Sequence, residues 1–190
     1  MPDLETERLR IRPLTPDDVT AVHHLYQSIG WLNHTESETE QLGSIRQYVE
    51  WSSQNHAQLA RLHQPPYGDR AVELKTSDEL VGLCGLVPYV DALGVFPYFG
   101  TKAGGLAFAE MGLFWAIAAN HQGRGYATEV AHALIQYAFT SLDLHHIIAT
   151  TDYDNLASQH VMQKAGMRLE YNPFPDPPWL QVLGIIENST

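Results

Sequence analysis

Alternating charged and apolar side chains open the chain, and helical spacing follows them. Residues 7–14, ERLRIRPL, alternate with a period of two, which predicts a strand with one solvated face. Thr15 and Pro16, followed by two aspartates, predict a helix start, and the helix is expected to end near Gly30. A second, longer helix is expected after Thr35 or Ser37. The polar run SSQNHAQ interrupts its apolar positions, so a partly exposed or broken helix is predicted.

The middle of the chain predicts strands around one apolar stretch. Residues 70–75 and 80–87 are read as the two arms of a hairpin. Residues 88–105, PYVDALGVFPYFGTKAGG, show no clean period and are expected to form a loop or insertion. The run LAFAEMGLFWAIAA then carries one charge, Glu110, and predicts a buried strand. A polar turn with two glycines, residues 120–125, leads directly into a helix over 126–139.

The remaining segments continue the alternation of strand and helix. Residues 144–150 predict a strand, 155–164 a helix that ends at a glycine, and 167–171 another strand. A proline-rich loop precedes a last strand over 179–186. The order β-α-α-β-β-β-α-β-α-β-β, without a repeat or a linker, predicts one α/β domain over residues 1–190.

Charge and composition narrow the class of partner. The formal net charge is −11, which disfavours nucleic acid and anionic membranes and favours cationic partners such as amines. We expect neither a membrane span nor a secretory signal, and therefore a cytoplasmic protein. The single cysteine, Cys84, lies in an apolar run and is expected to be a buried, reduced thiol. Ten histidines show no metal-ligand spacing, so no metal site is predicted.

The glycine turn has the character of an anion-binding nest, because the first N–H groups of a helix lack intrahelical partners. A P-loop is excluded, since no Gly-Lys-Ser/Thr follows. A dinucleotide fingerprint is matched only in part, with Thr128 where the third glycine belongs. The third reading is the acetyl-CoA motif Q/R-x-x-G-x-G/A, which Gln122, Gly125 and Ala127 satisfy.

Three further features accompany that motif: the strand ending LFWAIA, the run NLASQHVMQKAGM, and the opening LETERLRIRPLTPDD. Together they resemble the GNAT superfamily of N-acetyltransferases, in its Rim-type branch of ribosomal-protein N-terminal acetyltransferases. The resemblance is weakest at residues 36–68 and 88–105. It implies an α/β (α+β) fold with a mixed, mostly antiparallel twisted sheet, helices on both faces and splayed central strands.

The resemblance also implies which residues bind acetyl-CoA, the co-substrate. Turn backbone would hold the pyrophosphate, strand backbone would pair with the pantetheine arm, and the side chain of Asn155 would hydrogen-bond that arm. Asn155 is equally readable as a helix N-cap, and Arg124 as an ordinary surface arginine. The residues implied are Ile117, Ala118, Ala119, Gln122, Gly123, Arg124, Gly125, Tyr126, Ala127, Thr128 and Asn155.

Two side chains are implied for the chemistry. Glu110 is a candidate general base for the acceptor amine, or a carboxylate at a solvent-facing strand end. Many relatives use a tyrosine to protonate the departing thiolate, but the matching position here is Met162. Ser158, one turn past Asn155, is the alternative acid, or a helix-surface serine.

The implied activity is transfer of an acetyl group to a primary amine, either a protein N-terminus or a small amine, without a covalent intermediate. A coenzyme-A-binding regulator without turnover is the alternative. Four aromatic side chains in loops or beside them could form an acceptor wall or pack as ordinary loop residues: Trp31, Tyr89, Phe96 and Trp179. The acceptor's identity and a possible homodimer stay open.

Overall fold

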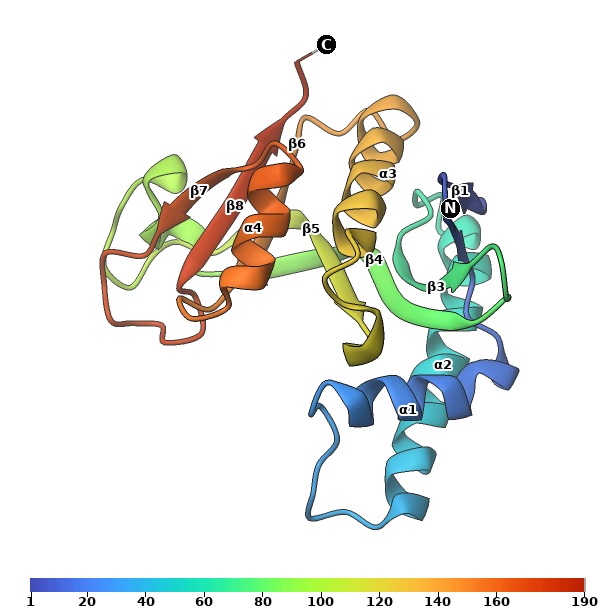
Figure 1. The fold of residues 1–190 in the computed structure, drawn as a ribbon. Coiled ribbons are helices and arrows are strands. Elements are labelled where there is room, and N and C mark those ends of the chain that lie inside the picture. Colours follow the sequence, from blue (N-terminus) through green and yellow to red (C-terminus); the bar gives the residue numbers. More distant parts are fainter. Residues whose placement is uncertain (190) are drawn as a thin grey trace. The chain divides into compact units, whose positions relative to one another are not determined.

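The computed structural model describes residues 1–189, with the side chain of residue 56 outside the description. Its helices and strands follow the predicted order, with one short strand added at the beginning (Figure 1). The four helices are α1 Val19–Ser28, α2 Glu38–Arg61, α3 Tyr126–Thr140 and α4 Leu156–Lys164. The strands are β1 Leu4–Glu5, β2 Leu9–Arg12, β3 Gly68–Leu74, β4 Leu80–Asp91, β5 Phe108–Ile117, β6 His146–Thr151, β7 Arg168–Tyr171 and β8 Val182–Glu187.

The sheet is mixed and mostly antiparallel, as predicted. Its strand order is β1-β2-β3-β4-β5-β6-β8-β7, and β5 and β6 form a parallel pair. By contact density the chain divides into two compact units. The N-terminal unit comprises Met1–Gly85 and Phe114–Ala133, and the C-terminal unit comprises Leu86–Leu113 and Leu134–Thr190.

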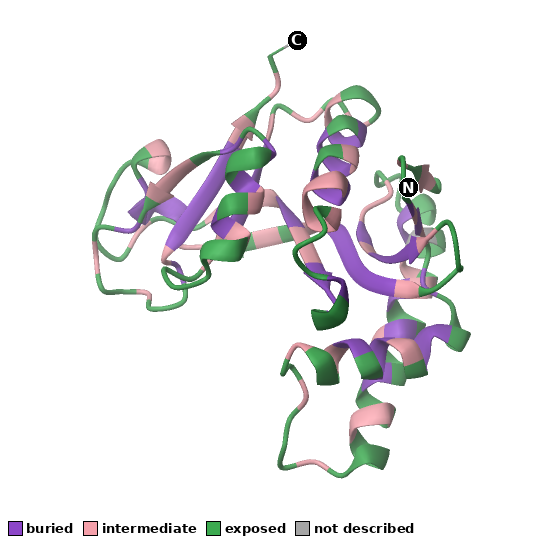
Figure 2. Ribbon diagram, in the orientation of Figure 1, coloured by how far each residue is buried: buried purple, intermediate pink, exposed green. Residues whose placement is uncertain are grey.

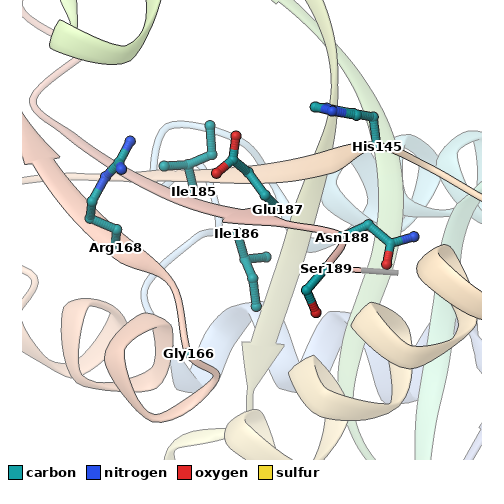
Figure 3. A pocket seen from close by; sticks show the side chains of 8 residues that line it. All are labelled: His145, Gly166, Arg168, Ile185, Ile186, Glu187, Asn188 and Ser189. Atoms are coloured by element: carbon teal, nitrogen blue, oxygen red, sulfur yellow. The ribbon is translucent and has the colours of Figure 1, made fainter.

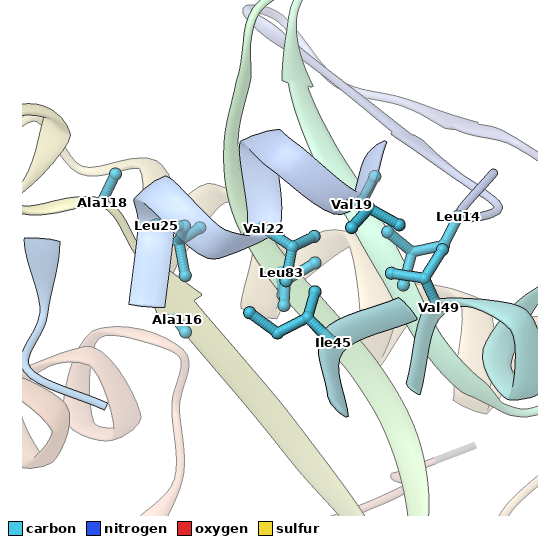
Figure 4. Close-up of a cluster of buried hydrophobic side chains, with 10 residues drawn as sticks. Leu14, Val19, Val22, Leu25, Ile45, Val49, Leu83, Ala116 and Ala118 are labelled. Carbon is cyan, nitrogen blue, oxygen red and sulfur yellow. The ribbon is translucent and has the colours of Figure 1, made fainter. Parts of the chain in front are cut away.

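The N-terminal unit is built on the alternation seen in the sequence. Leu9 and Ile11 of β2 are fully buried, while Arg10 and Arg12, which alternate with them, pair with Glu73 on the other face. At the predicted helix start a 3₁₀ turn, Pro16–Asp18, comes first and leads into α1. Thr15 caps this turn, and the carboxylate of Asp18 accepts a 2.7 Å bond from the N–H of Thr15. Helices α1 and α2 then pack an apolar cluster against β3, β4 and β5 (Figure 4): Leu14, Val19, Val22, Leu25, Ile45, Val49, Ala71, Leu83, Ala116 and Ala118.

Helix α2 has the first of the two predicted forms, a partly exposed helix, and not the second, a broken one. Ser37 caps it through a capping box with Glu40, and the helix runs unbroken for 24 residues. The reason is Ser52, a polar residue in the interrupting run, which is only 5% exposed and continues the buried stripe from Val49 toward Leu59. In Figure 2 the visible part of α2 carries exposed and intermediate segments.

The C-terminal unit corrects the prediction for residues 88–105. Strand β4 continues to Asp91, and two short 3₁₀ turns, Leu93–Val95 and Pro97–Phe99, follow it. The segment is packed against the sheet rather than loose, because Leu93, Val95 and Phe96 are fully buried against Ile148, Leu180, Leu183 and Ile185. Pro88 stands inside the strand, where a proline normally signals the end of one.

Candidate active site

The glycine turn lies in the N-terminal unit and has an open backbone. Gly123 and Gly125 have φ angles of +74° and +82°, a region that L side chains rarely adopt. A Cβ added to Gly123 would meet nothing within 4 Å. The first bond of α3 runs from the N–H of Glu129 to the carbonyl of Gly125 at 3.0 Å. The N–H groups of residues 126–128 therefore precede the helical ladder and can receive an anion.

Gln122 braces this turn against the end of β5. Its side-chain amide donates to the carbonyl of Ile117 at 2.9 Å. The N–H groups of Ala118 and Ala119 are also engaged, with the carbonyl of Val81 at 2.9 Å and the hydroxyl of Ser28 at 3.2 Å. These two donors are thus already used inside the protein. The pairing of the backbone of Ile117, Ala118 and Ala119 with a pantetheine arm stays a prediction.

Arg8, the residue just before β2, supports the glycine turn and was not predicted from the sequence. Its guanidinium lies 2.6 Å from the carboxylate of Glu129, and its Nη1 donates to the carbonyl of Arg124 at 2.9 Å. Its Nη2 lies 3.5 Å from the position of a Cβ on Gly125, and the guanidinium sits over the ring of Tyr126 at 4.7 Å. Thr6 donates a further 2.6 Å bond to Glu129. A positive charge is thus fixed beside the predicted pyrophosphate position.

The same contacts set the protonation of Glu129. Partial burial raises the pKa of its carboxyl, but the bonds from Thr6 and Arg8 outweigh that effect and leave the pKa below its ordinary value. Glu129 therefore stays ionised, and Arg8 offsets its charge in the first turn of α3. By contrast, Arg124 is exposed and donates to the carbonyl of Asn120 at 3.1 Å.

The candidate catalytic residues lie in the C-terminal unit. The carboxylate Oε2 of Glu110 is 2.6 Å from Nε2 of His146, and the two side chains are 14% and 18% exposed. The reading of Glu110 as a solvent-facing carboxylate is therefore wrong. Asn155 is the N-cap of α4, since its Oδ1 accepts a 3.1 Å bond from the N–H of Ser158. The cap brings these two predicted residues together, and Ser158 is half-buried.

Of the four predicted acceptor residues, Tyr89 and Trp179 come together around Asp91. The indole Nε1 of Trp179 donates to Oδ2 of Asp91 at 2.9 Å, and the phenol of Tyr89 lies 3.5 Å from the same oxygen. Trp179 is 61% exposed and leaves an aromatic face open beside a carboxylate. Asp91 was not predicted, because it lay in a segment read as loop.

The other two predicted acceptor residues lie elsewhere. Trp31, in the N-terminal unit, is exposed and stacks on Phe114. Phe96 is fully buried in the cluster of the C-terminal unit, so its side chain has no surface to offer an acceptor. Its assignment to an acceptor wall is corrected accordingly.

Cys84 has the environment expected of an inert thiol. Its side chain is fully buried, and burial raises the pKa of the thiol well above its ordinary value. Among the side chains that the structure describes, no three of His, Cys, Asp or Glu are grouped so as to hold a metal ion. No helix within residues 1–189 is long and apolar enough to cross a membrane.

Comparison with known proteins decides the family. Residues 8–168 match the family model described as an acetyltransferase (GNAT) domain. The chain belongs to the GNAT family of acetyltransferases. The resemblance drawn from the glycine turn and its flanking motifs is thereby confirmed, and with it the assignment to an enzyme family that uses acetyl-CoA as co-substrate.

Two curated relatives are named as N-acetyltransferases. The chain is 28% identical over 170 residues to the uncharacterized N-acetyltransferase YoaA of Bacillus subtilis, covering 89% of this chain and 84% of that protein. It is 46% identical over 56 residues to the uncharacterized N-acetyltransferase YnaD of the same organism. That match covers 30% of this chain and spans only 33% of YnaD.

Solved structures share the GNAT fold. One of them is the ribosomal-protein-S5-alanine acetyltransferase of Vibrio fischeri, with a TM-score of 0.64 at 14% identity. The alignment covers 98% of this chain and 97% of that one. At this identity the likeness shows the fold alone.

Proposed function

We propose that this GNAT chain transfers the acetyl group of acetyl-CoA directly to a primary amine, as a single acetyltransferase domain in the cytoplasm. The glycine turn carries the proposal. Two left-handed glycines, three helix N–H groups outside the helical ladder and a fixed arginine form a cradle suited to a pyrophosphate. Gly123–Thr128 would hold that group, and Ile117 and Asn155 would hold the pantetheine arm.

Direct transfer fits the side chains at hand. The amine must lose a proton before it attacks the thioester carbonyl, and Glu110 is the proposed acceptor of that proton. The thiolate that leaves must gain one, and the hydroxyl of Ser158 is the proposed donor. A covalent route would need an exposed thiolate, whereas Cys84 is buried and protonated.

The acceptor is proposed to carry a positive charge near its reactive amine. Asp91 presents a carboxylate, and Trp179 presents an exposed aromatic face held by that carboxylate. Such a pair suits an ammonium group, which a carboxylate attracts and an aromatic face stabilises. The net charge of −11 also attracts cationic molecules electrostatically. A basic peptide N-terminus and a small polyamine both fit this description.

The test is thiol release from acetyl-CoA in the presence of N-terminal peptides, polyamines, amino acids and aminoglycosides. We expect release with at least one cationic acceptor. Gly123→Ala should weaken acetyl-CoA binding, because a Cβ and a strained backbone would occupy the cradle. Gly30→Ala is the matched control: its φ is also +74°, and a Cβ there likewise meets nothing within 4 Å. If both variants bind acetyl-CoA as the wild type does, the pyrophosphate assignment is wrong.

One observation favours the alternative of a coenzyme-A-binding regulator. The position where many relatives have a catalytic tyrosine holds Met162, which is fully buried and packs under Gly184. A regulator would be stabilised by acetyl-CoA against heat yet release no thiol with any acceptor. An enzyme would do both, so the two assays together separate the candidates.

A further inference from the structure

Glu110 and His146 are neighbours because of the strand register. The parallel pair β5–β6 places Gly112 opposite Ile148, so the residues two positions earlier on each strand also stand side by side. Their side chains meet at 2.6 Å and are largely screened from solvent. A contact of this length between a carboxyl group and an imidazole nitrogen is a strong hydrogen bond when a proton lies between the two atoms.

The second ring nitrogen of His146 is also engaged. Its Nδ1 lies 3.2 Å from Nδ1 of His145, the preceding residue, whose side chain is exposed. Both nitrogens of His146 thus face another titratable side chain. A histidine in this position can take a proton at one nitrogen and give one up at the other.

His145 opens onto a pocket of about 560 Å³ in the C-terminal unit (Figure 3). Arg168 of β7, Glu187 of β8 and Asn188 also line this pocket. The three titratable groups therefore form a continuous path, from a screened carboxylate on β5 to an open, polar pocket.

We propose that Glu110, His146 and His145 form a proton relay that carries the acceptor's proton to solvent. The inference rests on the proposed acetyl transfer. The N–H bond of the acceptor ammonium breaks, and its proton passes to the carboxylate of Glu110. The next step uses the neutral tautomer of His146 with its proton on Nδ1 and none on Nε2. Nε2 takes the proton from the Glu110 carboxyl group as Nδ1–H passes its proton to Nδ1 of His145, and proton exchange with water restores that tautomer before the next turnover. Nε2–H of His145 then releases a proton to water in the pocket, and the neutral amine attacks the thioester.

Other charged groups face the relay and must be counted in its pH response. The ring of Tyr98 lies edge-on to His146 at 5.6 Å, and its hydroxyl donates to Glu187 at 2.9 Å. Burial, the bond to Glu187 and the charges of Glu187 and Glu110 raise the pKa of Tyr98, so its hydroxyl keeps its proton. Arg168 sits over the same ring at 5.7 Å and pairs with Glu170.

The kinetic test compares acceptors of different basicity. His146→Gln keeps a hydrogen-bonding amide beside Glu110 but cannot pass a proton on. At pH 7 we expect kcat for an aliphatic, charged amine to fall by about tenfold or more, in line with the usual contribution of general base catalysis. An aromatic amine, already neutral at that pH, should react nearly as fast as with the wild type. The loss with the charged amine should shrink as pH rises. His132→Gln, an exposed histidine on α3, is the control.

Equal slowing of both acceptors, or no slowing of either, would overturn the relay. A second measurement needs no turnover. Nitrogen-15 NMR of the imidazole groups should show that the balance between the two tautomers of His146 changes in Glu110→Gln and in His145→Ala. An unchanged tautomer balance in both variants would show an unconnected cross-strand contact and overturn the proposal. Absence of acetyl transfer by the wild type with every acceptor would instead contradict the proposed function.

Discussion

The side-chain amide of Gln122 donates to the backbone carbonyl of Ile117 at 2.9 Å and ties the glycine turn to the strand before it. The family motif accepts either glutamine or arginine at this position. Both are N–H donors, and the structure gives a reason for that choice: the partner is a carbonyl, which can only accept.

Gln122→Glu should therefore loosen the turn, and Gln122→Arg should not. A carboxylate would face a carbonyl oxygen and would also repel the proposed pyrophosphate. We expect the acetyl-CoA Kd to rise by about tenfold, the equivalent of about 1.4 kcal/mol, in the Glu variant. Isothermal titration with acetyl-CoA measures this. A Kd of Gln122→Arg as weak as that of Gln122→Glu would contradict the bracing role.

Arg8 is predicted to be a determinant of acetyl-CoA affinity. Arg8→Gln removes the cation beside Gly125 and leaves the carboxylate of Glu129 uncompensated at the start of α3, where the proposed anion sits. The Kd for acetyl-CoA should rise by about tenfold, within the range of charge-assisted interactions. The double variant Arg8→Gln, Glu129→Gln should recover part of the loss. Arg46→Gln, at an exposed position of α2, serves as the control.

The same ion pair predicts an acid dependence of stability. The pKa of Glu129 is lower in the folded chain than its unfolded value of about 4.3. A depressed carboxyl pKa stabilises the fold above the unfolded pKa, and that contribution is lost as pH falls through the folded pKa. Urea unfolding below about pH 4.3 should therefore show a weaker pH dependence for Glu129→Gln than for the wild type. Glu50→Gln, an exposed carboxylate on α2, should follow the wild-type slope.

Asp91 is predicted to select charged acceptors. Asp91→Asn keeps a side-chain oxygen for the indole N–H of Trp179 but removes the negative charge. KM for a cationic acceptor should rise by about tenfold, because a hydrogen bond between charged groups is lost. The kcat for a neutral aromatic amine should be unchanged. Steady-state thiol release with both acceptors checks this prediction. A similar change in the kinetic constants for the two acceptors would show that Asp91 does not take part in acceptor recognition.

Much of the fold was readable from local patterns. The caps at Ser37 and Asn155 and the alternation of β2 are short-range features, and the structure has each of them. The prediction was wrong where a proline took an unusual place, since Pro88 stands inside a strand that was expected to end at residue 87. Ser52 is buried within a helix stripe, and its polar character left a broken α2 open as an alternative that the structure does not have.

The candidate site was readable only where its residues are close in sequence. The turn from Gln122 to Thr128 is contiguous and could be found by its spacing. The pairing of Glu110 with His146 depends on the register of two parallel strands, and the pairing of Asp91 with Trp179 joins residues far apart in the chain. No local pattern of hydrophobic and polar residues indicates either pairing, so both became visible only in the structure.

The support of Glu129 by Thr6 and Arg8 has a consequence for the order of folding. These bonds join residues 123 and 121 positions apart. Contacts of such separation close late, because the loop between them must first be ordered. A chain still emerging during synthesis can form the glycine turn as soon as α3 is made, yet the turn gains its arginine only once the earliest residues have docked. Coenzyme affinity should therefore report on completion of the fold.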